Sequence, residues 1–375
     1  MSAISLKSWR ILLVSTPVAP LGSGFGGGVE LSLQNMALSL QLQGHRVTVL
    51  APENSVLPNN SSNIELQTVS GQLQTSMQFL NRTEPMCLPK NSVLANLWYR
   101  ARELQSEYDV VVNFAYDWLP FYLTPFFQTP LAHLVSMSSL TDTMDLAISQ
   151  VAQTSPQSLS FHTQVQAETF GLSNARIVGN ALDLELYSFC ARPRDYLAWV
   201  GRISPEKAIE DAIAVSQLTG LELRVYGILQ DQEYWQLLQQ RFPDAVINYR
   251  GFLDTTELQQ ELCQSKALLV TPRWIEAFGN VVIEALACGV PVIAYRRGGP
   301  AEIIRDGITG FLVEPDSVEG LVSAVAQIHK IDRQDCRNHA ITEYSLSAYG
   351  DRLNRWFEVL INSTLENVKK QSIPN

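Results

Sequence analysis

The sequence predicts an α/β protein made of two doubly wound, Rossmann-like domains. Two observations lead to this fold class. First, a chain of 375 residues is longer than one hydrophobic core usually supports, so two domains are expected. Second, short apolar runs alternate with segments of helical periodicity, and the alternation restarts near the middle of the chain. Strands that alternate with helices form a parallel sheet with helices on both faces.

The first half of the chain begins with a predicted strand–helix–strand unit. Residues 10–15 form an apolar run, and residues 30–43 carry leucines at helical spacing. Gly44 ends that helix, and a strand follows at 46–50. The other elements predicted in this half are a helix at 93–104 and strands at 110–113, 131–135 and 158–161.

The second half repeats this alternation after a linker near residues 180–183. Its predicted strands are 197–200, 222–226, 246–249, 267–270, 289–294 and 310–313. Its predicted helices lie near 209–218, 234–240, 256–266, 281–287 and 299–304. A last helix at 346–360 carries apolar residues at helical spacing.

Charge and cysteine content exclude several classes of partner. A net charge of −10 without a long basic run counts against nucleic acid and against electrostatic docking to anionic membranes. No apolar run is long enough to span a bilayer, and the run at 11–14 is too short for a signal-peptide core, so a cytoplasmic location is expected. The five cysteines are scattered, and the histidines form no ligand pattern, so we expect reduced thiols and no metal.

One stretch near residue 280 carries the strongest functional signal. Glu276 and Glu284 lie eight residues apart, and Phe278, Gly279 and Asn280 lead from the first into an apolar helix. The N–H groups and partial positive charge at a helix start suit a diphosphate, and carboxylates accept hydrogen bonds from sugar and ribose hydroxyls. The pattern predicts a site for a phosphorylated sugar. The competing interpretation is a solvated helix face.

Two further loops follow predicted strands, where ligands bind in open α/β sheets. After strand 197–200, Arg202 and Lys207 can both reach a diphosphate and stabilise the charge that grows on it. In the glycine-rich segment 22–30, Gly27 and Gly28 let the backbone approach a phosphate or sugar closely. The competing interpretations are a solvated basic loop and a flexible surface loop.

These segments together resemble the retaining family-4 glycosyltransferases, which have the GT-B fold. The similarity covers nearly the whole chain and is strongest from about 178 to 313, with a departure at Ala208, where relatives usually have Gly. The resemblance implies two Rossmann-like domains that face a cleft. Residues 1–181 would form the acceptor side, joined by a C-terminal helix at about 349–365 that crosses back, and residues 182–348 would bind the nucleotide sugar.

The resemblance also implies a reaction. A hexose would move from a nucleotide sugar, UDP-glucose, to an acceptor hydroxyl with retained configuration, without a metal or other cofactor. Arg202, Lys207 and Glu276 would be catalytic, and Glu284 would bind the ribose. The glycine loop, through Gly27 and Gly28, would face the donor.

The N-terminal segment contains the stretches Ser15–Val18, Pro20–Gly24 and Gly26–Leu31. These stretches resemble more narrowly the cyanobacterial UDP-glucose:tetrahydrobiopterin glucosyltransferases. This implies that the acceptor is the side-chain hydroxyl of a reduced pterin. Tyr116 stands where relatives often have His, and Asp117 follows it in a stretch that is strongly aromatic from 114 to 127. A flat acceptor suits this stretch, so Tyr116, Asp117 and Phe121 are assigned to acceptor binding. An aromatic stripe is, however, more often part of a core.

Several alternatives stay open. The acceptor can be a sugar or a lipid, the chain can be a GT-B sugar-nucleotide epimerase, or it can be a non-catalytic nucleotide-sugar-binding module. The intact pairs Arg202 with Lys207 and Glu276 with Glu284 favour transfer. UDP, GDP and ADP donors are not distinguished by the sequence. His133 lies in an apolar strand and is expected to be a buried core residue rather than a base.

Overall fold

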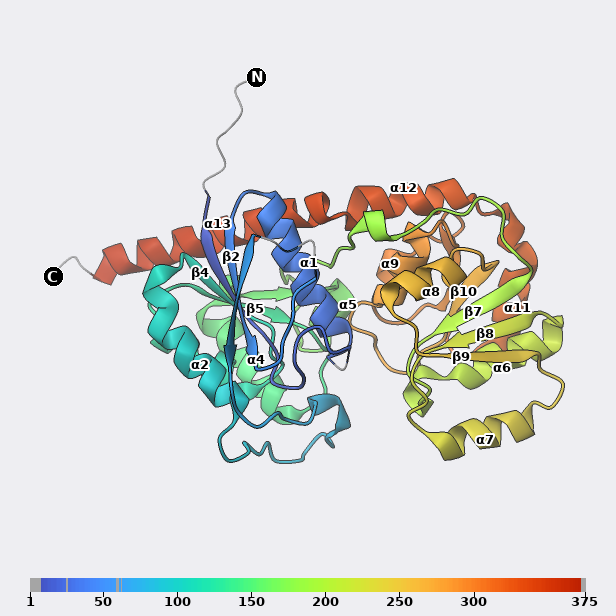
Figure 1. Cartoon of the computed structure of the whole chain (residues 1–375), viewed down its shortest axis with the longest axis horizontal. Helices are drawn as coiled ribbons and strands as arrows, with labels where there is room; N and C mark the ends of the chain where they lie inside the picture. Colours follow the sequence, from blue (N-terminus) through green and yellow to red (C-terminus); the bar gives the residue numbers. More distant parts are fainter. Residues whose placement is uncertain (1–7, 25, 59–60, 62, 372–375) are drawn as a thin grey trace, which may run out of the picture. The chain divides into compact units, whose positions relative to one another are not determined.

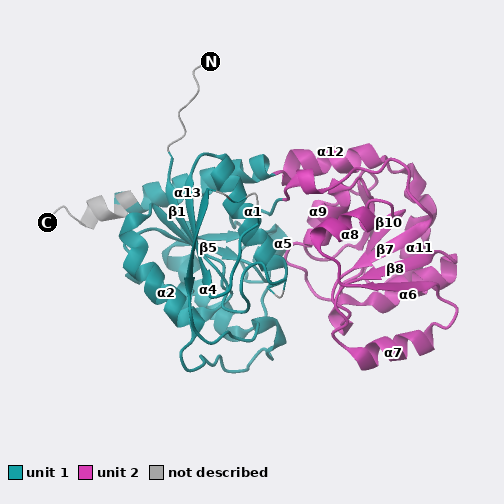
Figure 2. Ribbon diagram, viewed as in Figure 1, with its two compact units in different colours: residues 1–181, 346–375 teal, residues 182–345 magenta. Residues whose placement is uncertain are grey.

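The computed structural model describes residues 8–24, 26–58, 61 and 63–371, and its elements are traced in Figure 1. The chain divides into two compact units (Figure 2). Unit 1 consists of Met1–Ala181 and Leu346–Asn375, and unit 2 consists of Leu182–Ser345. The chain therefore completes unit 2 before its last helix returns to unit 1.

Unit 1 contains a six-stranded parallel sheet with the order β3-β2-β1-β4-β5-β6. Its strands are β1 (Arg10–Val14), β2 (Arg46–Pro52), β3 (Ile64–Val69), β4 (Val110–Asn113), β5 (Leu131–Val135) and β6 (Leu159–Phe161). The register places Ile11 opposite both Val47 and Val110. The winding reverses between β1 and β4, so the loops after these two strands diverge there.

Helices cover both faces of this sheet. They are α1 (Gly28–Leu42), α2 (Val93–Leu104), α3 (Trp118–Leu123), α4 (Asp142–Thr154), α5 (Gln164–Glu168) and α13 (Leu346–Gln371). Successive side chains of a strand point to opposite faces. Ile11 and Leu13 accordingly belong to the core formed with α1 and α13, whereas Leu12 and Val14 belong to the core formed with α2.

Unit 2 repeats this topology with the order β12-β11-β10-β7-β8-β9. Its strands are β7 (Tyr196–Val200), β8 (Glu222–Tyr226), β9 (Ile247–Gly251), β10 (Ala267–Val270), β11 (Val292–Tyr295) and β12 (Gly310–Val313). Its helices are α6 (Ile209–Thr219), α7 (Gln232–Arg241), α8 (Thr255–Leu262), α9 (Asn280–Ala287), α10 (Gly299–Ile303), α11 (Val318–Gln327) and α12 (Arg333–Tyr344). The winding reverses between β7 and β10.

Two doubly wound parallel sheets were predicted, and the structure confirms them. β3, α3, α4, α5, α11 and α12 were not predicted. β3 is an edge strand in which only Ile64 is buried, and α4 mixes apolar with polar residues throughout. The last helix begins at Leu346, slightly before the expected start of the segment that returns to the first unit.

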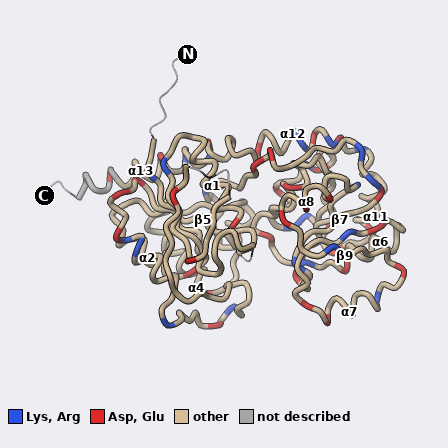
Figure 3. The backbone as a smooth tube through the Cα atoms, viewed as in Figure 1, with Lys and Arg blue, Asp and Glu red and all other residues tan. Residues whose placement is uncertain are grey.

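Charged residues of both signs are spread along each unit (Figure 3). Within the described part of the chain, no helix combines the length and apolar character that crossing a membrane requires.

The C-terminal helix α13 completes the core of unit 1. Tyr349, Leu353, Trp356 and Phe357 are fully buried and recur every three or four residues, which aligns them along one face of the helix. Trp356 also donates its indole N–H to the carbonyl of Gln157 at 2.9 Å. The helix is therefore part of the fold of unit 1 and not an appendage.

Trp356→Ala should lower the free energy of unfolding by about 3–5 kcal/mol, because it removes a large buried ring and leaves a cavity. Denaturant unfolding monitored by circular dichroism measures the change. Glu358→Ala, at an exposed position of the same helix, should stay within about 0.5 kcal/mol. Similar values for both variants would contradict the packing role of α13.

Candidate functional site

The two points at which the winding reverses gather most of the polar residues that the sequence singled out. In doubly wound sheets, ligands bind at such points, outside the carboxyl ends of the strands. In unit 2, Arg202 and Lys207 follow β7, and Glu276 follows β10. In unit 1, Thr16 follows β1 and Asp117 follows β4.

The loop after β7 is shaped by an unusual backbone position. Residues Pro205–Lys207 form a short 3-10 helix that ends at Ala208, which has left-handed torsion angles (φ 46°, ψ 52°). A non-glycine residue pays about 1–2 kcal/mol in this region. The Ala208 carbonyl accepts a hydrogen bond from Thr271 Oγ1 at 2.9 Å, which ties this loop to the end of β10. The tie holds Lys207 beside the loop that carries Glu276.

Lys207 and Glu276 form the central contact of the unit 2 site. Lys207 Nζ lies 2.6 Å from Glu276 Oε2, and each side chain is 19% exposed. Trp274 donates its indole N–H to the same oxygen at 3.0 Å, and its ring centroid lies 5.0 Å from Nζ. The sequence predicted both charged residues but gave no sign of Trp274. Lys207 and Glu276 thus form a cation–carboxylate pair that is partly exposed to solvent.

Arg202 lies on the same loop as Lys207. Its guanidinium donates to Gln230 Oε1 at 2.7 Å and to Glu206 Oε1 at 3.2 Å. Glu206 also accepts from the Ser204 hydroxyl at 2.7 Å. Arg202 is thus oriented by polar neighbours and remains partly exposed, as a phosphate-binding cation requires.

Glu284 is buried more deeply than a solvated helix face would allow. It lies in α9, is 7% exposed, and its Oε1 accepts a hydrogen bond from the Tyr187 hydroxyl at 3.1 Å. Burial raises the pKa of this carboxyl, against the lowering effect of the Tyr187 hydrogen bond. Gly279, at the N-cap of α9, has φ 101°. The interpretation as a solvated face is therefore wrong, and Tyr187 is a partner that sequence reasoning missed.

The turn at Gly298 and Gly299 packs closely against the loop that carries Glu276. The Gly299 N–H donates to the Glu276 carbonyl at 2.7 Å. A Cβ at Gly298 would lie 2.6 Å from the Glu276 nitrogen, and one at Gly299 would lie 2.2 Å from the Phe278 carbonyl oxygen. Only glycine permits this approach. The Phe278 side chain is itself buried and meets the ring of Tyr344 edge to face.

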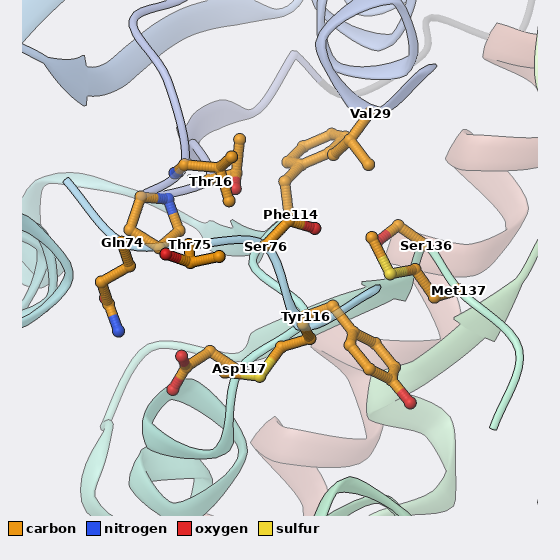
Figure 4. A pocket seen from close by; sticks show the side chains of 13 residues that line it. Thr16, Val29, Gln74, Thr75, Ser76, Phe114, Tyr116, Asp117, Ser136 and Met137 are labelled. Atoms are coloured by element: carbon orange, nitrogen blue, oxygen red, sulfur yellow. Dashed lines mark hydrogen bonds between the residues drawn. The ribbon is translucent and has the colours of Figure 1, made fainter. Parts of the chain in front are cut away.

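Unit 1 has a pocket at its own reversal point (Figure 4). It is lined by Thr16, Pro17, Val18, Val29, Gln74, Thr75, Ser76, Met77, Phe114, Tyr116, Asp117, Ser136 and Met137. Asp117 and Gln74 lie on one side of it and the Tyr116 ring on the other. Asp117 is 4% exposed and caps α3 by accepting from the Leu119 N–H. Burial raises its pKa to about 6, although hydrogen bonds from Leu119, Trp118 and Gln74 lower it.

Tyr116 and Phe121 differ from the expected stacking platform. The Tyr116 ring lines the pocket, but its hydroxyl donates to the Ser138 carbonyl at 3.3 Å and accepts from the Leu140 N–H at 3.4 Å. Phe121 is buried against the ring of His133, with centroids 4.4 Å apart, and is not among the residues that line the pocket. The core interpretation thus holds for Phe121, because its face of α3 points into the unit.

Three pocket residues were missed by sequence reasoning. Gln74 lies on the same side of the pocket as Asp117 and lowers the pKa of that carboxyl, and Thr16 lies just beyond the end of β1. Ser136 has a buried hydroxyl for which the described residues supply no partner. Buried polar groups normally find a partner, so an unpaired hydroxyl in a pocket wall indicates a place for a ligand group. No motif surrounds these residues in the sequence.

The glycine loop of unit 1 is organised by a carboxylate. Glu30 accepts hydrogen bonds from the N–H groups of Gly22, Gly24 and Gly26. These three donors are occupied, so they do not serve the phosphate contact expected of the loop as a whole. Gly27, at the N-cap of α1, has φ 61°, and a Cβ there would meet nothing within 4 Å. Phe25 lies outside the described residues.

His133 is a core residue, as predicted. It is fully buried, its ring nitrogens face Asn113 at 3.2 Å and Thr124 at 2.9 Å, and burial lowers its pKa to about 3. Within the ranges that the structure describes, no group of three or more His, Cys, Asp or Glu residues has the arrangement of a metal site.

Comparisons with known proteins agree with this geometry. Residues 191–344 match the family model of the glycosyl transferases group 1. This match lies within unit 2 and includes Arg202, Lys207, Glu276 and Glu284. It is also similar to glycogen synthase of Mycobacterium tuberculosis, with 27% identity over 361 residues that cover 85% of this chain and 86% of that protein.

Solved structures extend the likeness over both units. HepE of Anabaena in complex with UDP gives a TM-score of 0.73 at 17% identity and covers 93% of this chain and 100% of its own. AviGT4, a glycosyltransferase involved in avilamycin A biosynthesis, gives 0.70 at 18% identity and covers 94% and 98%. At such identities the likeness concerns the fold alone, and it confirms the predicted GT-B fold.

Asp117→Asn should stabilise unit 1 by up to about 3 kcal/mol at pH 8, since the raised pKa means that the buried carboxylate opposes folding when ionised. The native carboxyl binds its proton more tightly than the unfolded one. Wild-type stability should therefore fall as pH rises from about 4 to about 6, and the gain from Asn should vanish below pH 4. Urea unfolding across this range measures both effects. The exposed Glu107→Gln is the control, and a pH-independent gain would contradict the explanation.

Proposed function

We propose that this protein is a glycosyltransferase that transfers glucose from UDP-glucose to a small acceptor hydroxyl with retained configuration and without a metal, and that the acceptor is a reduced pterin such as tetrahydrobiopterin. In this proposal unit 2 binds the nucleotide sugar and unit 1 binds the acceptor. The observation that carries the transfer reaction is the contact between Lys207 and Glu276 at the reversal point of unit 2.

The donor assignment rests on the charges of unit 2. Lys207 and Arg202 would bind the diphosphate, Glu276 the transferred sugar and Glu284 the ribose. Glu276 holds Lys207 in a fixed position, so that a cation stands ready on this loop for a diphosphate. UDP and UDP-glucose are present in the HepE structures, whose fold this chain shares, which favours a uridine nucleotide.

The mechanism follows from where charge develops. As the bond between sugar and diphosphate breaks, negative charge grows on the leaving oxygen, and Arg202 and Lys207 stabilise it by charge-assisted hydrogen bonds. The incoming hydroxyl approaches the same face of the sugar and gives its proton to a diphosphate oxygen. Glu276 orients the sugar by accepting from its hydroxyls. Retention then needs no side-chain base.

The acceptor assignment rests on the pocket of unit 1. Asp117 can accept two parallel hydrogen bonds from the amidine-like edge of a pterin ring. The Tyr116 ring supplies an apolar wall opposite, and the unpaired Ser136 hydroxyl is available to a polar ligand group. A pterin is flat and has such an edge, whereas sugar and lipid acceptors lack it, so this carboxylate favours the pterin.

Lys207→Ala and Arg202→Ala should each reduce kcat/KM for transfer by roughly 10–150-fold, because each removes one charge-assisted hydrogen bond worth about 1.5–3 kcal/mol. Steady-state kinetics of UDP release with varied UDP-glucose measure the loss. Arg305→Ala is the matched control, since it removes an exposed cation of unit 2 that pairs with Glu343. Near-normal values for both site variants would refute the diphosphate role.

Asp117→Asn should raise KM for tetrahydrobiopterin at least tenfold and leave UDP-glucose hydrolysis without acceptor nearly unchanged, since only acceptor binding loses its carboxylate. Product mass identifies the glucosylated pterin. Activity with sugar or lipid acceptors and none with reduced pterins would overturn the acceptor proposal alone.

Two simpler measurements separate the remaining alternatives. UDP-glucose hydrolysis or transfer distinguishes an enzyme from a nucleotide-sugar-binding module, and an epimerase would release a changed sugar without an acceptor. Transfer should survive EDTA, because cationic side chains supply the charge that a metal provides elsewhere. Loss with EDTA and recovery with Mg²⁺ or Mn²⁺ would contradict the metal-free mechanism.

A further inference from the structure

Four cysteines gather at the edge of unit 2 opposite its candidate donor site. Cys190, Cys263 and Cys288 precede β7, β10 and β11, and segments before parallel strands meet at the amino ends of those strands. Cys336 lies in α12, which begins beside them at Arg333. The sequence spacing gave no sign of this cluster, because the residues are far apart along the chain.

A single guanidinium holds the backbones of two of these cysteines together. Arg333 donates from Nε to the Cys190 carbonyl at 2.7 Å and from Nη2 to the Cys263 carbonyl at 2.6 Å. A guanidinium bound through two nitrogens places its acceptors side by side, as it does the two oxygens of a carboxylate. The Cys190 N–H also donates to the Cys288 carbonyl at 3.4 Å. The segment that carries Cys190 is thus fixed against the end of α8.

The thiols of Cys190 and Cys263 also lie near each other. The Cys190 thiol adds to the burial that raises the pKa of the Cys263 thiol, so the two side chains lie within interaction range. Each thiol donates to a backbone carbonyl of its own segment, Cys190 to Arg192 at 3.3 Å and Cys263 to Gln260 at 3.2 Å. A disulfide requires close backbones and facing side chains. The shared guanidinium brings the two backbones together, and rotation of the two thiols away from these carbonyls would bring the sulfurs into contact. Cys288 is fully buried, and its thiol lies near the Gln259 carbonyl at 3.8 Å.

The two thiols differ in accessibility. Cys190 is partly exposed, whereas Cys263 is 8% exposed and burial raises the pKa of its thiol. A cavity of about 340 Å³ is lined by Phe189 and Ala191, the neighbours of Cys190 in the chain, by the cations Lys266 and Arg333, and by the carboxylate of Asp332. A small anionic reagent therefore has room next to the segment that carries Cys190, where two cations outnumber one carboxylate.

We propose that Cys190 and Cys263 are a redox-active pair that forms a reversible disulfide by exchange with a small anionic disulfide of the oxidised-glutathione class. The Cys190 thiolate attacks one sulfur of the reagent, the S–S bond of the reagent breaks, and one reagent thiol leaves with a proton. The Cys263 thiol then loses its proton and attacks the Cys190 sulfur, which releases the second reagent thiol. Two electrons pass from the protein thiols to the reagent.

The test uses the full-length protein incubated with oxidised glutathione at pH 8, blocked with iodoacetamide and mapped by mass spectrometry without reduction. The expected product is a peptide pair joined through Cys190 and Cys263 and separated by dithiothreitol. Cys87 is the internal control, since it is an exposed thiol of unit 1 and should carry only glutathione. The cross-link should also raise Tm relative to the reduced protein, because it restricts the unfolded chain.

Two variants test the order of the steps. Cys263→Ser should stop at a mixed disulfide of glutathione with Cys190, and Cys190→Ser should leave Cys263 reduced, because its thiol is shielded. The proposal is overturned if Cys190 and Cys263 stay reduced in the wild type while Cys87 reacts fully. A stable glutathione adduct on wild-type Cys190, or a link from Cys190 to Cys288, would overturn it equally.

Discussion

Burial of both faces of each parallel sheet is the constraint on which the rest of this structure depends. A parallel strand has helices above and below it, so its interior positions must be apolar on both sides. Polar chemistry is then excluded from the strands and confined to the loops beyond their ends. In unit 1 this yields Asp117 after β4, and in unit 2 it yields Lys207 after β7 and Glu276 after β10. The reversal of winding keeps these loops apart and leaves room for a ligand.

The loops at these strand ends contain strained backbone and buried carboxyls, which lower the stability of the fold, whereas the apolar cores raise it. Ala208 adopts left-handed torsion angles, and Gly298 and Gly299 bring two backbone segments into contact at the expense of side chains. Asp117 and Glu284 are buried carboxyls, and burial raises the pKa of both. Groups of this kind concentrate at functional sites, where local stability is given up for a fixed arrangement of charge. The Lys207–Glu276 pair belongs to the same pattern, since each ion holds the other in place.

The amino ends of the strands in unit 2 lie at the edge of the sheet opposite the candidate site, and the buried cation there has a structural role. Arg333 satisfies three backbone carbonyls there, those of Cys190, Cys263 and Ser265. This is a structural use of a buried cation, because each donor meets an acceptor that would otherwise lack a partner. The same hydrogen bonds hold the backbones of Cys190 and Cys263 close to each other. One edge of the sheet in unit 2 thus carries the proposed donor site, and the opposite edge carries the cysteines.

The sequence by itself determined the two doubly wound sheets, most of their strands, and the loops that carry Arg202, Lys207, Glu276 and Asp117, because strand and helix periodicity and glycine positions are local signals. It did not reveal β3, which has one buried residue and hence little pattern. Only the tertiary structure decided which side chains meet. These contacts depend on how the chain folds back on itself and on which side chains are buried, and local sequence patterns predict neither. Examples are the contacts of Tyr187 with Glu284, of Trp274 with Glu276, of Glu30 with the glycine loop and of Cys190 with Cys263. The same holds for Phe121, whose place in the core depended on which face of a short helix turned inward.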